Sequence, residues 1–315
     1  MDLLSSMVIL AFIYATPILV AATGALYSER SGVTNIAIEG IMTIGGFAAA
    51  TITTLTEARL GIWAPWLGIL IGAVLGLIYS ALHAYVSIDL QGDQTISGTA
   101  LNMLSLGISV YFCQIIFHQQ RTRAFQRGFV KMDIPVLSDI PILGNLFFKR
   151  IYITFYLALL IVLLTYIILW KTPYGLRLRA AGEHPSAVDS LGISVRALRY
   201  SGVLISGFLG GLAGGIMVLT QATQFSAGSI HGVGFIAMAA LIFGRWNPWG
   251  ILGSSIFFGF SQIFSIFSRD IPLLENVPGE FFYALPYALT VLAMVAFSRK
   301  SAAPKAVGVP YSSTH

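Results

Sequence analysis

The sequence is dominated by long apolar runs that contain almost no charged side chains. A helix needs about 20 apolar residues to cross the hydrocarbon core of a membrane. Lipid offers the backbone no hydrogen-bond partner, so such runs fold as helices. The runs cover residues 3–26, 40–56, 66–88, 94–117, 151–170, 200–244, 246–268 and 281–298. They predict an all-α, polytopic transmembrane helical bundle.

Composition supports this interpretation and excludes several other classes. Hydrophobic residues make up 56% of the chain and charged residues only 10%, whereas soluble chains average about 25% charged residues. The net charge of +5 comes from Lys and Arg gathered between the apolar runs, and no aromatic-interleaved basic patch indicates a nucleic-acid partner. The single cysteine, Cys113, cannot form an intramolecular disulfide, and no Cys/His spacing indicates a metal site.

The run at 200–244 is too long for one membrane helix and slightly short for two full ones. Its middle, residues 221–232, is polar and rich in small side chains. We expect a full span ending near Thr220, followed by a shorter or re-entrant segment from about Val233, because broken helices are tolerated where they line a cavity. This predicts about 8–9 membrane segments within residues 1–300, and a disordered cytoplasmic tail over 301–315.

Small residues recur at intervals of four in two of these runs. One ladder lies in the run at 66–88 and the other in the run at 200–244, and their members are Gly68, Gly72 and Gly76, then Gly207, Gly211 and Gly215. Such spacing lets two helices approach closely. The ladders predict either packing within the bundle or a surface that slides during transport.

Residues 171–199 form a polar connection between two strong spans. The connection contains five basic residues, Lys171, Arg177, Arg179, Arg196 and Arg199, and the positive-inside rule places it in the cytoplasm. Pro185 is suited to the first position of a helix and Gly192 to its end. The pattern predicts a short helix, with Ala187 and Leu191 on one face, that either contacts a partner protein or is an ordinary surface helix.

Three stretches of the chain resemble bacterial ABC importer permeases of the branched-chain amino acid, ribose and nucleoside group. The connection reads GLRLRA at 175–180, then Gly182, Glu183, Pro185, Ala187 and Gly192, and a glycine-rich stretch follows at 206–215. Residues 28–42 read SERSGVTNIAIEGIM, a form similar to the nucleoside branch, and residues 244–250 read GRWNPWG. Ala37 stands where the group usually has Gly or Ser, which is a mild departure.

The resemblance implies a multi-pass permease of the bacterial cytoplasmic membrane that performs no covalent chemistry. It implies an ABC ATPase subunit or fused two-domain ATPase, a second and often longer permease, and an extracytoplasmic substrate-binding lipoprotein as partners. ATP and Mg²⁺ would bind to the ATPase, with no cofactor in this chain. The implied cargo is a nucleoside, with ribose-like sugars, riboflavin and branched-chain amino acids as alternatives. The implied ATPase-coupling residues are Gly182, Glu183, Pro185, Ala187, Asp189, Leu191 and Gly192.

A cytoplasmic 171–199 loop would place the loop at 118–150 outside the cell. That assignment conflicts with its six basic residues, Arg121, Arg123, Arg127, Lys131, Lys149 and Arg150, since the positive-inside rule applies to loops of this length. We assign the 171–199 loop, the coupling loop, to the cytoplasm, because it must meet an ATPase. The basic loop is then expected to face the acidic surface of a substrate-binding protein.

Polar side chains near the membrane are candidates for the transport pathway or its gate. Glu39 is the strongest candidate, because a carboxylate at the centre of a membrane helix costs about 2.5–3.5 kcal/mol on insertion scales. Glu39 and Asn35 serve either as structural anchors or in the gate. Asn102, Gln221 and Gln224 either contact the cargo or join neighbouring helices, which is the commoner use.

The motifs of other function classes are missing from the sequence. There is no GxxxxGK[ST] motif, so no P-loop binds ATP here, and there is no HExxH or GxSxG motif of hydrolases. No paired carboxylates in one span indicate an ion relay. A secondary transporter driven by an ion gradient and a membrane scaffold without transport remain the alternatives to an importer permease.

Overall fold

A computed structural model of the chain describes residues 3–134, 148–267 and 303–312, with isolated positions at 138, 144, 281, 288 and 291. Its architecture is helical, apart from one two-residue strand pair, β1 (Lys131–Met132) and β2 (Ile151–Tyr152). The long helices are α1 (Leu3–Arg30), α2 (Ile38–Leu60), α3 (Ala64–Ala84), α4 (Gln94–Phe117), α5 (Ile153–Lys171), α8 (Val195–Gln221) and α10 (Pro248–Phe267). The shorter ones are η1 (Gly61–Trp63), a π-helical turn at Tyr85–Asp89, α6 (Pro173–Glu183), α7 (Pro185–Asp189) and α9 (Val233–Phe243).

The apolar runs of the sequence correspond to these helices. In the described residues, 6 helical stretches are long and apolar enough to cross a membrane. One of them, Ile38–Asp89, has 52 residues and contains both α2 and α3. The all-helical membrane architecture is therefore confirmed, while the last expected segment, 281–298, lies largely outside the described residues.

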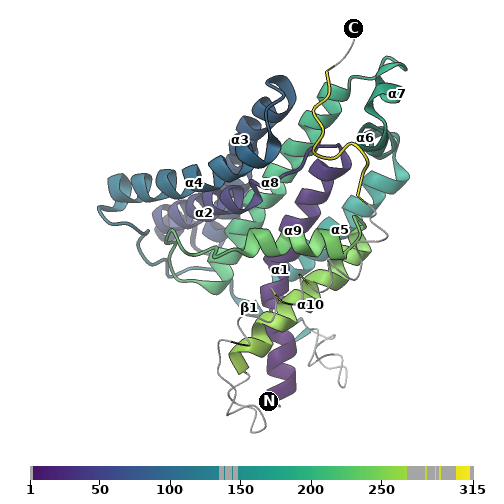
Figure 1. The fold of residues 1–315 in the computed structure, drawn as a ribbon. Helices are drawn as coiled ribbons and strands as arrows, with labels where there is room; N and C mark the ends of the chain where they lie inside the picture. The colour runs from purple at the N-terminus through teal and green to yellow at the C-terminus, as the bar shows by residue number, and fades with distance from the viewer. Residues whose placement is uncertain are drawn as a thin grey trace.

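Two helices form the centre of the bundle. In the most apolar stretch of α1, 83% is buried, and in α8 the figure is 78%, against 28% in α4. Figure 1 shows α1 and α8 surrounded by the other helices, with α4 at one edge. The outer face of α4 exposes large apolar side chains such as Ile96, Met103 and Tyr111, as expected for a surface that meets lipid or another membrane subunit.

The two glycine ladders face each other inside this chain. A Cβ on Gly76 of α3 would lie 2.5 Å from the Gly207 carbonyl oxygen of α8, and one on Gly211 would lie 2.3 Å from the Gly72 oxygen. Gly72 in turn faces the Gly45 oxygen of α2 at 2.6 Å from an added Cβ. Because these distances leave no room for a side chain, the ladders bring α2, α3 and α8 into backbone contact. They serve packing within the bundle, as one of the two interpretations predicted.

Helix α9 is the short segment that the sequence predicted. It begins at Val233 and has 11 residues, which span about 16 Å at 1.5 Å per residue and cannot cross a core of about 30 Å. In Figure 1 it lies across the bundle, at a steep angle to α1. Gly232, at φ 81°, turns the chain into this helix.

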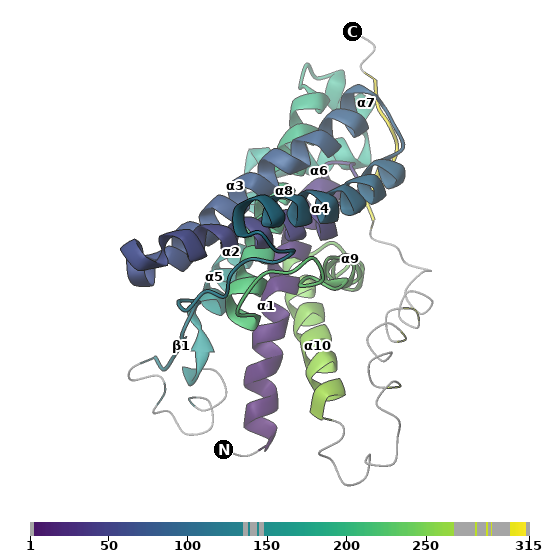
Figure 2. The same cartoon turned by 90° about the vertical axis from the view of Figure 1, so that its left-hand side faces the viewer.

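The molecule has two distinct ends. The N-terminus and β1 lie at one end, and α6, α7 and the C-terminal segment lie at the other (Figures 1 and 2). Residues 121–129 pack along the C-terminal end of α8, where Phe129 N–H donates to the Leu219 carbonyl at 3.1 Å. The described part of the 118–150 loop and the 171–199 loop therefore lie at opposite ends of α8.

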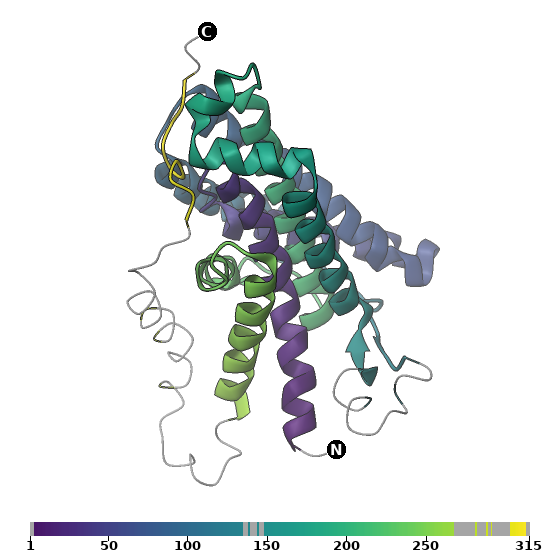
Figure 3. The same cartoon turned by 90° about the vertical axis from the view of Figure 1, so that its right-hand side faces the viewer.

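The described part of the C-terminal tail packs on the rest of the molecule. Residues 303–312, yellow in Figure 3, run past the end of α1 and beside α6. Ala306 N–H donates to the Gly182 carbonyl at 2.8 Å, and Gly308 N–H donates to the Gly32 carbonyl at 3.2 Å. The disorder expected for 301–315 on composition alone therefore does not describe these ten positions, whose backbone groups find partners on α6 and on the segment that follows α1.

Candidate functional site

The 171–199 connection contains two helices rather than the single one expected. The first, α6, begins at Pro173, and the Thr172 hydroxyl accepts a hydrogen bond from Gly175 N–H at 3.2 Å. An N-cap Thr followed by Pro at the first helical position is a recognised start signal, so this helix was visible in the sequence. Gly175 sits against α5, where an added Cβ would lie 2.2 Å from the Ile168 oxygen.

The second helix, α7, begins at Pro185 as the sequence predicted, and it is only 5 residues long. It ends at Asp189, so Leu191 lies beyond it and shares no helical face with Ala187. Leu191 is 76% exposed, and Val188 is the residue that turns inward at 4% exposed. Gly192, at φ 72°, then redirects the chain towards α8. The exposed Ala187 and Leu191 leave an apolar tip at this end of the molecule.

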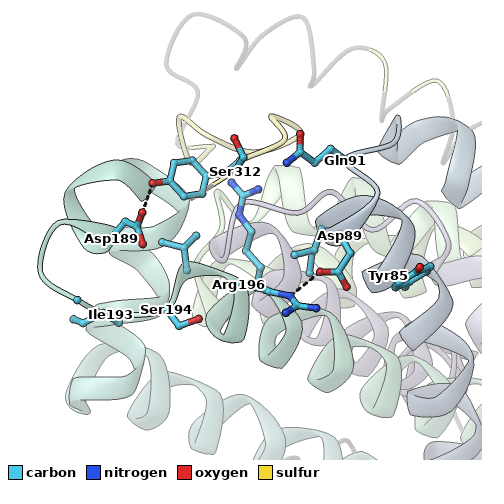
Figure 4. A pocket seen from close by; sticks show the side chains of 13 residues that line it. Tyr85, Asp89, Gln91, Asp189, Ile193, Ser194, Arg196 and Ser312 are labelled. Atoms are coloured by element: carbon cyan, nitrogen blue, oxygen red, sulfur yellow. Dashed lines mark hydrogen bonds and ion pairs between the residues drawn. The ribbon is translucent and has the colours of Figure 1, made fainter. Parts of the chain in front are cut away.

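A pocket of about 710 Å³ lies between the end of α7, the start of α8, the turn that follows α3 and the C-terminal segment. Its walls are seen in Figure 4, where Asp189 stands on one side and Asp89 and Arg196 form an ion pair on the other. The Tyr311 hydroxyl donates to the Asp189 carboxylate at 3.0 Å. Burial first, and the Asp189 carboxylate second, raise the pKa of Tyr311, so the phenol keeps the proton that it donates.

Glu39, in the first turn of α2, binds the N-terminal end of α9. Its two carboxylate oxygens accept from the N–H groups of Gly232 at 2.7 Å and Gly234 at 2.6 Å. The first N–H groups of a helix have no partner within the helix, and a negative side chain there also favours the helix dipole. Gly234 must be glycine, because an added Cβ would lie 2.6 Å from the Glu39 Cα atom.

Asn35 and Asn102 brace the same region. Asn102 of α4 accepts from Gly40 N–H at 2.7 Å and donates to the Ile36 carbonyl at 2.9 Å. Asn35 donates to the Ser206 hydroxyl of α8 at 2.8 Å, and its buried Oδ1 atom has no hydrogen-bond partner among the residues that the structure describes. The structure thus brings Asn35, Glu39 and Asn102 together around the start of α2.

The two glutamine candidates lie apart from this group. Gln221, the last residue of α8, donates to the Ile13 carbonyl of α1 at 3.2 Å. In the part of the chain that the structure describes, no hydrogen bond is made by the side chain of Gln224. Gln221 therefore joins two helices, and Gln224 lies in the polar segment between α8 and α9.

Three further residues act at the other end of α9, although their positions in the sequence did not single them out. The Trp246 indole N–H donates to the Glu29 carboxylate, and the Trp246 carbonyl accepts from Arg30 Nη2 at 2.8 Å. Arg30 also lies 3.9 Å from the Glu183 carboxylate. The motifs at 28–42 and 244–250 contain these residues, but only their spatial contact shows how they pair.

Comparison with known proteins identifies the family. The model of the family described as "Branched-chain amino acid transport system / permease component" matches residues 7–294. The chain belongs to this permease family. It is accordingly an ABC transporter permease component rather than a catalytic subunit, and a multi-pass protein of the bacterial cell membrane.

Relatives of known description cover nearly the whole permease. The chain is 44% identical to the guanosine ABC transporter permease protein NupQ of Bacillus subtilis, over 98% of this chain and 97% of NupQ. It is 40% identical to the nucleoside ABC transporter permease protein NupC of Lactococcus lactis, over 95% of this chain and 94% of NupC. A putative glucose ABC transporter permease protein, TsgC13 of Haloferax volcanii, is 34% identical over 82% of this chain and 76% of its own length. No solved structure matches.

Proposed function

We propose that this permease carries nucleosides through the membrane in an ATP-driven importer. The observation that supports the cargo is its 44% and 40% identity, over nearly full length, to relatives described as guanosine and nucleoside permeases. The putative glucose permease is less similar, at 34%, and a probable branched-chain amino acid permease, LivH of Methanocaldococcus jannaschii, reaches 27%. Sugars and branched-chain amino acids are therefore weaker candidates.

A second, longer permease is the proposed partner within the membrane. Bacillus subtilis has a guanosine permease protein NupP besides NupQ, and this chain is only 25% identical to NupP. The match covers 84% of this chain but 74% of NupP, so NupP is longer. Lactococcus lactis shows the same pattern, with NupB matched at 24% over 66% of its length. Because each pair contains one relative like this chain and one unlike it, we infer a heterodimer of permeases.

The 171–199 loop is the proposed contact with the ATPase. The apolar tip at Ala187 and Leu191 is exposed, and Gly182 and Glu183 lie directly against the end of α1. An ATPase or fused two-domain ATPase that binds the tip would therefore displace α1 as well as α8. Rigid-body motion of packed helices is one of the ways in which such a displacement opens and closes a path.

The opposite end of the molecule is the proposed contact with a substrate-binding lipoprotein. Arg121, Arg123 and Arg127 lie in the loop that packs on the C-terminal end of α8, and they would meet an acidic surface of that protein. Exchange of these arginines for Ser should reduce uptake at low substrate concentration. Unchanged uptake would remove the basis for this contact.

Glu39 and α9 are the proposed gate. A short helix that begins inside the bundle leaves its first N–H groups within the membrane, and the Glu39 carboxylate accepts hydrogen bonds from them. Discontinuous helices of this kind form cargo sites in other transporters, with unwound backbone at the site. The polar segment between α8 and α9, with Gln224, would then face the path, and Asn35 and Asn102 would hold the start of α2 in place.

Uptake of labelled guanosine and uridine tests the cargo and the energy source together. Cells that lack this gene are compared with cells whose associated ATPase carries an inactivating substitution, and with the parent strain. If both lesions abolish uptake, the nucleoside proposal holds. Uptake that survives both lesions would make the cargo a different solute, to be sought with ribose, riboflavin and leucine, and uptake lost only with this gene would favour an ion-driven transporter.

A further inference from the structure

The turn between α9 and α10 has an unusual backbone that the end of α1 holds in place. Arg245 and Trp246 have φ angles of 53° and 51°, a left-handed region that residues other than Gly rarely adopt. The Trp246 side chain is 7% exposed and donates to Glu29, while its carbonyl accepts from Arg30 Nη2 at 2.8 Å and Nε at 3.3 Å. A strained turn persists only where its surroundings over-determine it, and here Glu29 and Arg30 provide those contacts.

Arg30 is also the residue through which α1 meets the coupling loop. Its Nη1 atom lies 3.9 Å from the Glu183 carboxylate, and its guanidinium lies 5.8 Å from the centre of the Trp170 ring. The Arg30 side chain is 15% exposed and the Glu183 side chain 38% exposed, so solvent ions screen this pair in part. An added Cβ on Gly182 would lie 2.4 Å from the Arg30 carbonyl, so the loop cannot move towards α1 without displacing it.

Helix α9 is thereby held at both ends by residues on either side of the connection between α1 and α2. Glu39 binds its N-terminal N–H groups, and Arg30 binds the turn that follows its C-terminal end. The glycines at the turn bring α9 and α10 into backbone contact, since an added Cβ on Gly250 would lie 2.2 Å from the Gly244 oxygen. Because α9 has only 11 residues, displacement of its end near Trp246 would turn the whole helix about the end bound by Glu39.

We propose that Arg30 is a positioning residue that passes displacement of the coupling loop to α9. This inference rests on the ABC permease role set out above. When a partner moves Glu183, the guanidinium follows the carboxylate, and the Trp246 carbonyl follows the guanidinium. The end of α9 next to Trp246 then swings, while the end bound by Glu39 stays with α2. Arg30 is suited to this role because one planar guanidinium donates to the Trp246 carbonyl and at the same time lies within ion-pair distance of the Glu183 carboxylate.

The ratio of cargo transported to ATP hydrolysed tests the proposal. The complete complex, with its ATPase, second permease and binding protein, is reconstituted in vesicles with wild-type or variant chain. Arg30→Gln cannot contact Glu183 and the Trp246 carbonyl at the same time. It should lower this ratio about five-fold or more, since five-fold is the lower end of the effects typical of coupling between sites. Glu183→Gln should lower it as well, and the double variant should lose no more than the larger single effect, because the two residues act in one path. Arg30→Lys should lie between wild type and Arg30→Gln.

The matched control is Arg245→Gln, which also removes one positive charge, at an exposed side chain in the turn that Arg30 contacts, and should leave the ratio unchanged. If Arg30→Gln lowers transport and ATP hydrolysis in equal proportion, its role is structural and the proposal is overturned. Additive losses in the double variant would overturn the shared path. If the wild-type complex shows no ATP-dependent transport of any nucleoside offered, the proposed cargo is contradicted. The same ratio, measured with the alternative cargo that is transported, then tests the role of Arg30 separately.

Discussion

Removal of the Glu39 carboxylate should loosen the N-terminal end of α9. Glu39→Ala deletes both acceptors that the Gly232 and Gly234 N–H groups use, at 2.7 and 2.6 Å. Leaving a buried N–H without a partner costs about 1–3 kcal/mol. The two bonds are partly buried, so we take the lower value for each and expect a loss of about 2 kcal/mol in the free energy of local opening.

Hydrogen exchange of the purified protein, followed by mass spectrometry, measures this loss directly. Each 1.4 kcal/mol is a factor of ten in an equilibrium, so 2 kcal/mol should speed exchange at residues 232–236 by about 30-fold. Glu39→Gln retains one acceptor oxygen and should show a smaller increase, of about five-fold if one bond of about 1 kcal/mol is lost. Exchange elsewhere in α8 and α10 should not change.

Glu57 at the other end of α2 provides a matched control. Its carboxylate also accepts from two backbone N–H groups, those of Gln126 at 2.8 Å and Arg127 at 3.0 Å. Glu57→Ala should speed exchange near 126–127 and leave α9 unchanged. If Glu39→Ala leaves exchange at 232–236 at the wild-type rate, packing alone holds α9 and the reasoning about its cap is refuted.

Two further experiments test packing and the tail. Gly211→Ala places a Cβ 2.3 Å from the Gly72 oxygen and should lower the melting temperature of the purified protein. Gly107→Ala, with nothing within 4 Å of its Cβ, should leave that temperature equal or higher, and equal effects would contradict the packing argument. Tyr311→Phe removes the bond to Asp189, at a cost of about 0.5–1.5 kcal/mol, and should speed limited proteolysis near the C-terminus; an unchanged cleavage rate would show that the bond contributes nothing.

The helices themselves could be predicted from the sequence because each membrane segment must satisfy its backbone within itself. The start of α9 at Val233 followed from a polar, small-residue stretch after a long apolar run. The bounds of α4, Gln94–Phe117, coincide with an uncharged run. Local patterns also contained the start of α6, at Thr172 and Pro173, although only the helix that begins at Pro185 was expected in this connection.

The partners of the candidate site residues could not be predicted, because they depend on which segments meet in space. Glu39 was identified as costly in a membrane, but its function as a cap required knowing that α9 begins beside α2. Arg30 and Trp246 lie in separate motifs, and their contact is set by the angle at which α9 crosses the bundle. The packing of residues 303–312 was missed because the tail is rich in Ser, Ala, Pro and Gly and has little to bury, while its backbone hydrogen-bond partners lie on α6 and just beyond α1.

The most direct test of the central claim is ATP-driven accumulation of a nucleoside by the purified complex in sealed vesicles. The complex contains this permease, its partner permease and the ATPase, with binding protein and labelled guanosine on the opposite side of the membrane from ATP. The account predicts accumulation above the external concentration with ATP, and none with a non-hydrolysable analogue or with a catalytically inactive ATPase. Accumulation driven by an ion gradient without ATP, or ATP-driven accumulation of a sugar or amino acid but of no nucleoside, would contradict it.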